Sequence, residues 1–184
     1  MLLPLWSVGK GRKNILSKEQ LSFNHAIAQT INLLITSLDS SIIFILENYR
    51  EDKVVIENIY KEIKEKQNVS IVDKKFTVDE NLNFISQIDV LISMRLHPLI
   101  LASLVRTPFV GIIAHLKVAN FLLQVKEREQ GVPYERLNPK EFNKKIEGVL
   151  KRSNQVKKEL NANVEALRQK AILNAELAKK LIYN

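Results

Sequence analysis

Hydrophobic and polar positions along the chain form two kinds of pattern. Short runs in which almost every position is apolar are typical of strands that are buried on both faces. Longer stretches, in which apolar residues recur every three or four positions, are typical of helices with one buried face. The apolar runs predict five strands, at Leu2–Val8, Ser41–Leu46, Val69–Val72, Asp89–Met94 and Pro108–Ile113.

The periodic stretches predict helices between these strands. Two helices are expected to begin at a capping box, Ser17 with Gln20 and Thr77 with Glu80. In such a pair the hydroxyl and the longer polar side chain satisfy backbone amides that have no partner inside the helix. Further helices are predicted at 53–66, 98–104 and 118–125.

The last part of the chain predicts a loop followed by a long helical region. Residues 130–138 contain a glycine and a proline and are expected to form the loop. Asn138 and Pro139 then suit the cap and the first position of a helix. Apolar residues continue at helical spacing over residues 142–182, with a break expected near Ser153.

Apolar strands that alternate with helices predict a doubly wound parallel α/β sheet with helices on both faces. We expect a Rossmann-like sheet of five or six strands, with the five predicted strands in the spatial order 3-2-1-4-5. Residues 1–138 would form this domain, and residues 139–184 a long C-terminal helical segment that packs on it and extends beyond it. Because ligands of such sheets bind beyond the carboxyl ends of the strands, the loops Gly9–Lys13 and Ser93–His97 matter most.

Composition excludes several kinds of chemistry. The 184 residues contain no cysteine, which excludes disulfides, thiolate metal sites and a thiol nucleophile. The three histidines, His25, His97 and His115, are too dispersed to predict a metal site. His25 is expected to be structural or exposed, and His115 is either a surface residue or part of a donor site. No apolar run approaches the ~20 residues of a membrane span, and we expect a cytoplasmic protein.

The charge of the chain is uneven. The net charge is +8, and the segment from Pro139 onward holds 11 basic and 5 acidic residues. Such a segment attracts nucleic acid or an anionic membrane face, or it is simply a solvated, lysine-rich helix. We do not expect nucleic acid as a partner, and peripheral contact with the inner face of the membrane stays open.

The segment from Ser93 to Pro98 concentrates groups that suit an anionic ligand. Arg95 offers a planar fork of N–H donors for a carboxylate or phosphate. His97 offers an imidazole, which exchanges a proton near neutral pH. The helix that begins here adds free amides and the positive end of its dipole. The structural alternative is that His97 caps the helix and Arg95 binds a local acid.

This segment resembles the polysaccharide pyruvyl transferase family, with Arg-Leu-His after an aspartate-containing strand as the most specific part. The matching stretches are Asp89–Ala102, Thr107–Ile112 and Lys117–Leu122, and a looser resemblance covers Ser41–Val125. The resemblance implies a GT-B-like fold of two Rossmann-like domains. This chain would be the C-terminal half, and we expect it to be inactive or weak without an N-terminal domain.

The resemblance also implies an activity and its residues. Members of the family move the enolpyruvyl group of phosphoenolpyruvate onto a sugar of a cell-surface polysaccharide or its lipid-linked precursor, without a metal or a further cofactor. By this resemblance His97 would be the catalytic acid–base residue. Arg95 would hold the donor anion, and Lys117, Ser93 and Arg12 are further candidates for substrate binding.

The sequence departs from the family pattern at two places. Many members have a Tyr-Asp-Pro-Lys-like stretch where this chain has residues 114–117, and only the lysine is kept. The arginine that commonly follows the first strand is missing, and Arg12 is offset. Two other functions therefore stay open. One is the nucleotide-sugar-binding half of a GT-B glycosyltransferase, with Glu135 or Glu141 facing ribose hydroxyls, and the other is a non-catalytic interaction domain.

The final helix is predicted to be longer than its own domain can cover. Its apolar stripe runs from Val156 to Ile182. Burial of one large aliphatic side chain contributes about 1.5–3 kcal/mol, so exposed members of the stripe favour association. We expect the end of this helix to bind the N-terminal domain or an acidic partner, to self-associate, or to stay mobile.

Overall fold

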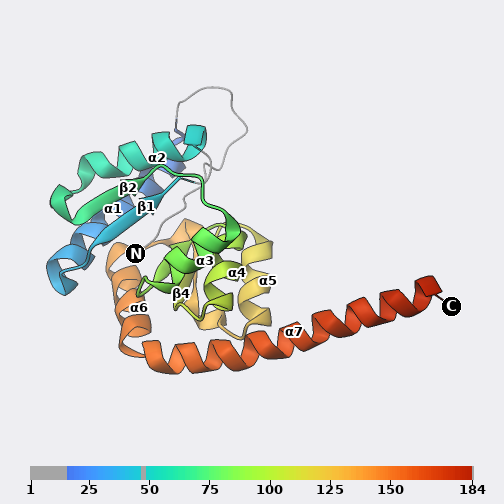
Figure 1. Cartoon of the computed structure of the whole chain (residues 1–184). Coiled ribbons are helices and arrows are strands. Elements are labelled where there is room, and N and C mark those ends of the chain that lie inside the picture. Colours follow the sequence, from blue (N-terminus) through green and yellow to red (C-terminus); the bar gives the residue numbers. More distant parts are fainter. Residues whose placement is uncertain (1–15, 47–48, 184) are drawn as a thin grey trace.

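The computed structural model describes residues 16–46 and 49–183, and its elements follow the predicted order (Figure 1). The helices are α1 (Lys18–Leu38), α2 (Tyr49–Glu62), α3 (Val78–Ser86), α4 (Leu96–Leu104), α5 (Leu116–Gln124), α6 (Pro139–Lys151) and α7 (Ser153–Tyr183). The strands are β1 (Ile42–Ile45), β2 (Val69–Val72), β3 (Leu91–Ser93), β4 (Phe109–Ile113) and β5 (Gly131–Pro133).

The paired strands are parallel throughout the described residues. β1 pairs with β2, with Ile42 opposite Val69. β3 pairs with β4, and β4 pairs with β5 on its other side. The predicted parallel α/β fold is therefore confirmed. The predicted strand Leu2–Val8, which the predicted order places between β1 and β3, lies outside the described residues.

Helices cover both faces of the strands and give a three-layer, Rossmann-like arrangement. Successive residues of a strand point to opposite faces, so each strand contributes to two cores. Phe44 and Ile92 join the core that α1, α2 and α6 cover. Ile45 and Leu91 join the core that α3, α4, α5 and the start of α7 cover. The apolar runs of β1, β3 and β4 reflect this burial on both sides, whereas Ser70 and Ile71 of β2 are exposed.

The prediction of a loop over residues 130–138 is wrong at its start, because Gly131–Pro133 form β5. Glycine at this position allows close packing of the two strands. A Cβ atom at Gly131 would lie 2.6 Å from Cδ1 of Ile113 on the neighbouring strand. Pro133 ends β5, which has one partner among the described strands, and a proline is tolerated on such an edge.

The helix predicted at 53–66 is displaced, because α2 begins at Tyr49 and ends at Glu62. A side chain from α1 fixes this end. Oδ1 of Asn32 accepts a hydrogen bond from the backbone N–H of Lys64 (2.9 Å), and its Nδ2 donates to the carbonyl of Glu62 (3.1 Å). This capping comes from a distant part of the chain, so local periodicity did not reveal it.

Both predicted capping boxes are confirmed. The hydroxyl of Ser17 accepts from the backbone N–H of Gln20 (3.2 Å), and Gln20 Oε1 accepts from the N–H of Ser17 (2.8 Å). Thr77 and Glu80 form the same pair of bonds at 3.2 and 2.8 Å. The predicted break in the final helical region occurs at Arg152, between α6 and α7.

The long helix α7 begins on the domain and then extends away from it as an arm (Figure 1). Its first part is packed, since Val156 and Leu160 are buried. Further along, Leu177 is 50% exposed and Leu181 85% exposed. The prediction that the domain cannot cover the whole stripe is therefore confirmed. Within the described residues no helix is both long enough and apolar enough to cross a membrane.

Candidate functional site

The predicted site residues Ser93, Arg95, His97 and Lys117 lie at the carboxyl edge of the strands. β3 and β4 are parallel neighbours with Ser93 opposite Gly111, so both strands end at the same edge. α4 and α5 each begin three residues after the preceding strand ends. Arg95 and His97 therefore follow one strand, and Lys117 follows the adjacent one. The fold brings these segments, about 20 residues apart in the chain, to one edge.

Arg95 is anchored by a buried carboxylate from another part of this edge. Its Nη2 donates a hydrogen bond to Oδ1 of Asp52 at 2.5 Å. The Asp52 side chain is 0% exposed and that of Arg95 is 17% exposed. Asp52 lies near the start of α2, which follows β1, whereas Arg95 follows β3. The ion pair therefore joins the β1 and β3 sides of the edge.

This pairing confirms that Arg95 binds a local acid, the alternative named from the sequence. An arginine carries five N–H donors, so one guanidinium has the capacity to bind a carboxylate and a second anion. Asp52 was missed in the sequence because 43 residues separate it from Arg95. The only local signal was an acidic residue just after a buried strand.

Ser93 shapes the loop that carries Arg95. Its buried hydroxyl accepts a hydrogen bond from the backbone N–H of Arg95 (2.9 Å) and donates to the carbonyl of the same residue (3.0 Å). The one hydroxyl proton is therefore used inside the loop. The role of Ser93 that the structure supports is to position Arg95, and its predicted contact with substrate stays a prediction.

His97 and Lys117 are exposed at the same edge. The cap position of α4 is occupied by Arg95, so the alternative in which His97 caps the helix is wrong. In the described part of the chain the His97 ring makes no hydrogen bond or ion pair. Lys117 lies in the first turn of α5, next to Leu116, which is 81% exposed. Both side chains can therefore meet a ligand from solvent.

A comparison with protein families identifies the reaction class. Residues 6–115 match the sequence model of the family described as polysaccharide pyruvyl transferase, which is more than half of the chain. The chain belongs to the polysaccharide pyruvyl transferase family. The matched region contains Arg95 and His97 and ends two residues before Lys117. Comparisons with curated proteins and with solved structures find no match.

Two predicted parts of the transferase site are not covered by the structure. Arg12 and the Gly9–Lys13 loop lie outside the described residues, so their contribution stays a prediction.

His115 is half-buried directly before α5 and is the residue at its cap position, without a side-chain capping bond. The described residues hold no group of three or more side chains suited to a metal ion.

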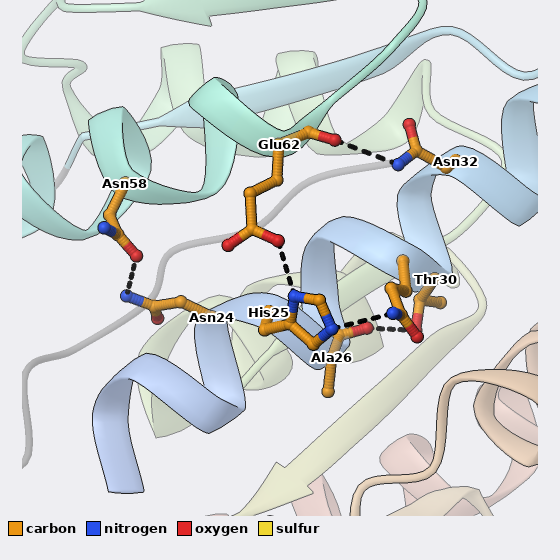
Figure 2. Close-up of polar contacts among 8 residues, drawn as sticks. Asn24, His25, Ala26, Thr30, Asn32, Asn58 and Glu62 are labelled. Atoms are coloured by element: carbon orange, nitrogen blue, oxygen red, sulfur yellow. Dashed lines mark hydrogen bonds and ion pairs between the residues drawn. The ribbon is translucent and has the colours of Figure 1, made fainter. Parts of the chain in front are cut away.

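The third histidine of this transferase is part of the fold. His25 Nδ1 lies 2.5 Å from Oε2 of Glu62, and its Nε2 lies 2.7 Å from Nε2 of Gln29 (Figure 2). Beside this pair Asn24 donates to Asn58 at 3.1 Å. These bonds tie α1 to α2, which confirms the prediction that His25 is structural or exposed.

Two hollows of the described surface lie elsewhere. One, of about 700 Å³, borders the α1–α2 interface and is lined in part by His25, Glu62 and Lys140. Another, of about 420 Å³, is lined by Ser41 and Asp89, which precede β1 and β3 and so mark the opposite edge of the sheet. Neither is lined by Ser93, Arg95, His97 or Lys117.

Proposed function

We propose that this chain provides the donor-binding half of an enzyme that moves the enolpyruvyl group of phosphoenolpyruvate onto a sugar of a cell-surface polysaccharide or its lipid-linked precursor. One observation carries this proposal. Arg95, anchored by buried Asp52, lies at the carboxyl edge beside an exposed histidine that has no partner in the described fold. Family membership supports a transferase, and this geometry supports the assignment of its donor site.

The donor has two anionic groups, a carboxylate and a phosphate, and the edge offers cationic groups on neighbouring strands. Arg95 suits a flat, bidentate partner because its guanidinium is planar and Asp52 fixes its orientation. Lys117 supplies a second positive charge from the start of α5. The first turn of α4 adds free backbone amides. Arg12 is a further candidate for the phosphate.

In the proposed reaction His97 gives a proton to the methylene carbon of phosphoenolpyruvate. Positive charge then develops on the neighbouring carbon, and a sugar hydroxyl forms a C–O bond there while its proton returns to His97. A second hydroxyl of the same sugar displaces phosphate, which leaves with its bonding electrons and takes up the proton of that hydroxyl, and a pyruvate ketal remains. Proton transfer by a positioned side chain contributes roughly 10²–10⁴-fold to such a rate. The proposal uses no metal and no further cofactor.

In this proposal the sugar acceptor is bound by a second domain that faces this chain. The resemblance suggests an N-terminal Rossmann-like domain, on this chain or on a separate one, that faces the carboxyl edge. Exposed Leu116 beside Lys117 fits a surface that such a domain would cover. A cytoplasmic location, where phosphoenolpyruvate is available, belongs to the same proposal.

Calorimetric titration of the chain with phosphoenolpyruvate tests the donor assignment. We expect saturable binding that Arg95→Gln weakens by at least tenfold, because a hydrogen bond to a charged group contributes about 1.5–3 kcal/mol. Arg128→Gln is the matched control, since exposed Arg128 lies before β5 at the opposite edge. Binding of a nucleotide sugar in place of phosphoenolpyruvate would contradict the proposal and favour the glycosyltransferase alternative.

A further inference from the structure

The outer part of α7 is an amphipathic arm without a partner in the described structure. Every residue from Arg168 to Ile182 is exposed, although several are large and apolar. The exposed fractions are 40% for Ile172, 53% for Leu173, 50% for Leu177, 85% for Leu181 and 74% for Ile182. Figure 1 shows this part of α7 extending beyond the domain, so the domain's own helices do not cover it.

The leucines of the arm form a line that does not continue the packed face of α7. Leu173, Leu177 and Leu181 are four residues apart and share one side of the helix. At 3.6 residues per turn this side is rotated by about 80° from the side that Val156 and Leu160 bury on the domain. Because the outer part of α7 extends away from the domain (Figure 1), the leucine line is open to a surface outside the domain.

Positive charge borders this line. Residues 168–182 hold four basic side chains, Arg168, Lys170, Lys179 and Lys180, and one acidic side chain, Glu176. By helical geometry Lys170 and Lys180 lie on the side of the leucines or at its margin. A lysine in this position packs its aliphatic stem on apolar surroundings and extends its ammonium group toward an anion.

We propose that the α7 arm docks on an anionic membrane surface, with the leucine line in the interface and the bordering lysines at lipid phosphates. A basic amphipathic helix binds such a surface by lying in its plane. Charge complementarity favours a bilayer over a second copy, because a second copy would bring two basic arms together, whereas an anionic bilayer offers opposite charge. The inference does not depend on the proposed transferase activity.

Flotation of the full chain with lipid vesicles tests this proposal. We expect binding to vesicles of phosphatidylcholine and phosphatidylglycerol, weaker binding to phosphatidylcholine alone, and a loss of affinity at high salt. The triple variant L173Q/L177Q/L181Q should lower the affinity for anionic vesicles at least tenfold. The double variant K170Q/K180Q should lower it about tenfold.

Two matched controls separate docking from general effects. Ile172→Gln removes one exposed aliphatic side chain from the opposite side of the arm and should change the affinity less than twofold. K157Q/K158Q removes two charges from the part of α7 that packs on the domain and should have a much smaller effect than K170Q/K180Q. Circular dichroism of each variant checks that α7 still forms.

Three results would overturn the proposal. One is a wild-type chain that does not float with anionic vesicles. Another is an equal loss of affinity in the leucine variant and in Ile172→Gln. The third is a concentration-dependent dimer, seen by light scattering, that the leucine variant dissolves while vesicle binding is unchanged, because a second copy would then be the occupant.

Discussion

Two histidines of this chain differ in whether their ring nitrogens have hydrogen-bond partners inside the described fold. At the α1–α2 interface both ring nitrogens of His25 have partners, Glu62 and Gln29 (Figure 2). At the carboxyl edge of the sheet the His97 ring has no hydrogen bond or ion pair within the described residues. A histidine with both partners inside the fold holds two helices together. A histidine without such partners is free to meet a ligand.

The ion pairs of the two regions differ in how deeply their side chains are buried. His25 and Glu62 are 57% and 40% exposed, and exposed pairs contribute about 0–1 kcal/mol to stability. Asp52 is fully buried against Arg95, and removal of one partner of a buried pair costs about 3–5 kcal/mol. The buried pair thus fixes an arginine at the edge where a ligand would bind, while the exposed pair adds little. Burial, rather than residue type, separates the two regions.

The largest expected effect is on turnover. In a preparation that carries out pyruvyl transfer, His97→Ala should lower kcat at least hundredfold, because it removes the proposed proton donor. The dissociation constant of phosphoenolpyruvate should change far less. His25→Ala should leave kcat within about twofold, since His25 is at the helix interface. Steady-state kinetics of both variants measures this difference in kcat. Equal losses of turnover in the two variants would contradict the prediction.

The next effect is on stability. Asp52→Ala should lower the free energy of unfolding by about 3 kcal/mol, because it leaves the guanidinium of Arg95 without its buried partner. Glu62→Ala should cost less than about 1 kcal/mol, since its pair with His25 is exposed. Urea unfolding of both variants measures the two costs. If Asp52→Ala proves no more costly than Glu62→Ala, the buried pair is not the anchor described here.

The smallest effect concerns Glu80, whose carboxylate is exposed and accepts two hydrogen bonds. Hydrogen bonds from Lys74 and from the backbone of Thr77 lower the pKa of Glu80 from 4.5 to about 2. A pKa that is lower in the folded state contributes stability above pH 4.5, and this contribution is lost as the pH falls toward 2. Glu80→Gln should flatten the pH dependence of stability in this window.

Thermal unfolding between pH 5 and pH 2 measures this loss in the wild-type chain and in Glu80→Gln. Lys74→Gln should flatten the curve in part, because the lysine is the largest cause of the lowered pKa. Neither variant should alter donor binding, since the Glu80 carboxylate contacts Lys74 and Thr77 rather than Arg95. A shift of donor affinity in Glu80→Gln would contradict this separation of stability from binding.

Much of the fold was predictable from local sequence. Apolar runs located β1, β3 and β4 because both faces of these strands are buried, and the boxes at Ser17 and Thr77 located helix starts because they act within four residues. Boundaries set by distant contacts were not predictable. Asn32 ends α2 from another helix, and β5 is formed by residues that include a glycine and a proline. Such residues usually indicate a loop.

The candidate site was predictable only in part. Arg95 and His97 were found because their segment follows a buried strand and begins a helix, a context that the chain shows locally. Asp52 was not found, because the fold brings it to Arg95 from 43 residues away in the chain. The uncovered apolar surface on α7 was predictable because the apolar stripe of this helix is longer than the surface of the domain on which the helix packs.

Histidine side-chain NMR with added phosphoenolpyruvate tests whether the donor binds beside His97. The chain has three histidines, so His25→Gln, His97→Gln and His115→Gln variants assign every ring signal. We predict that phosphoenolpyruvate shifts the ring signals of His97 in a saturable way and leaves those of His25 in place. Phosphoenolpyruvate that binds without moving the His97 signals, or that moves those of His25 instead, would contradict a donor site at the carboxyl edge.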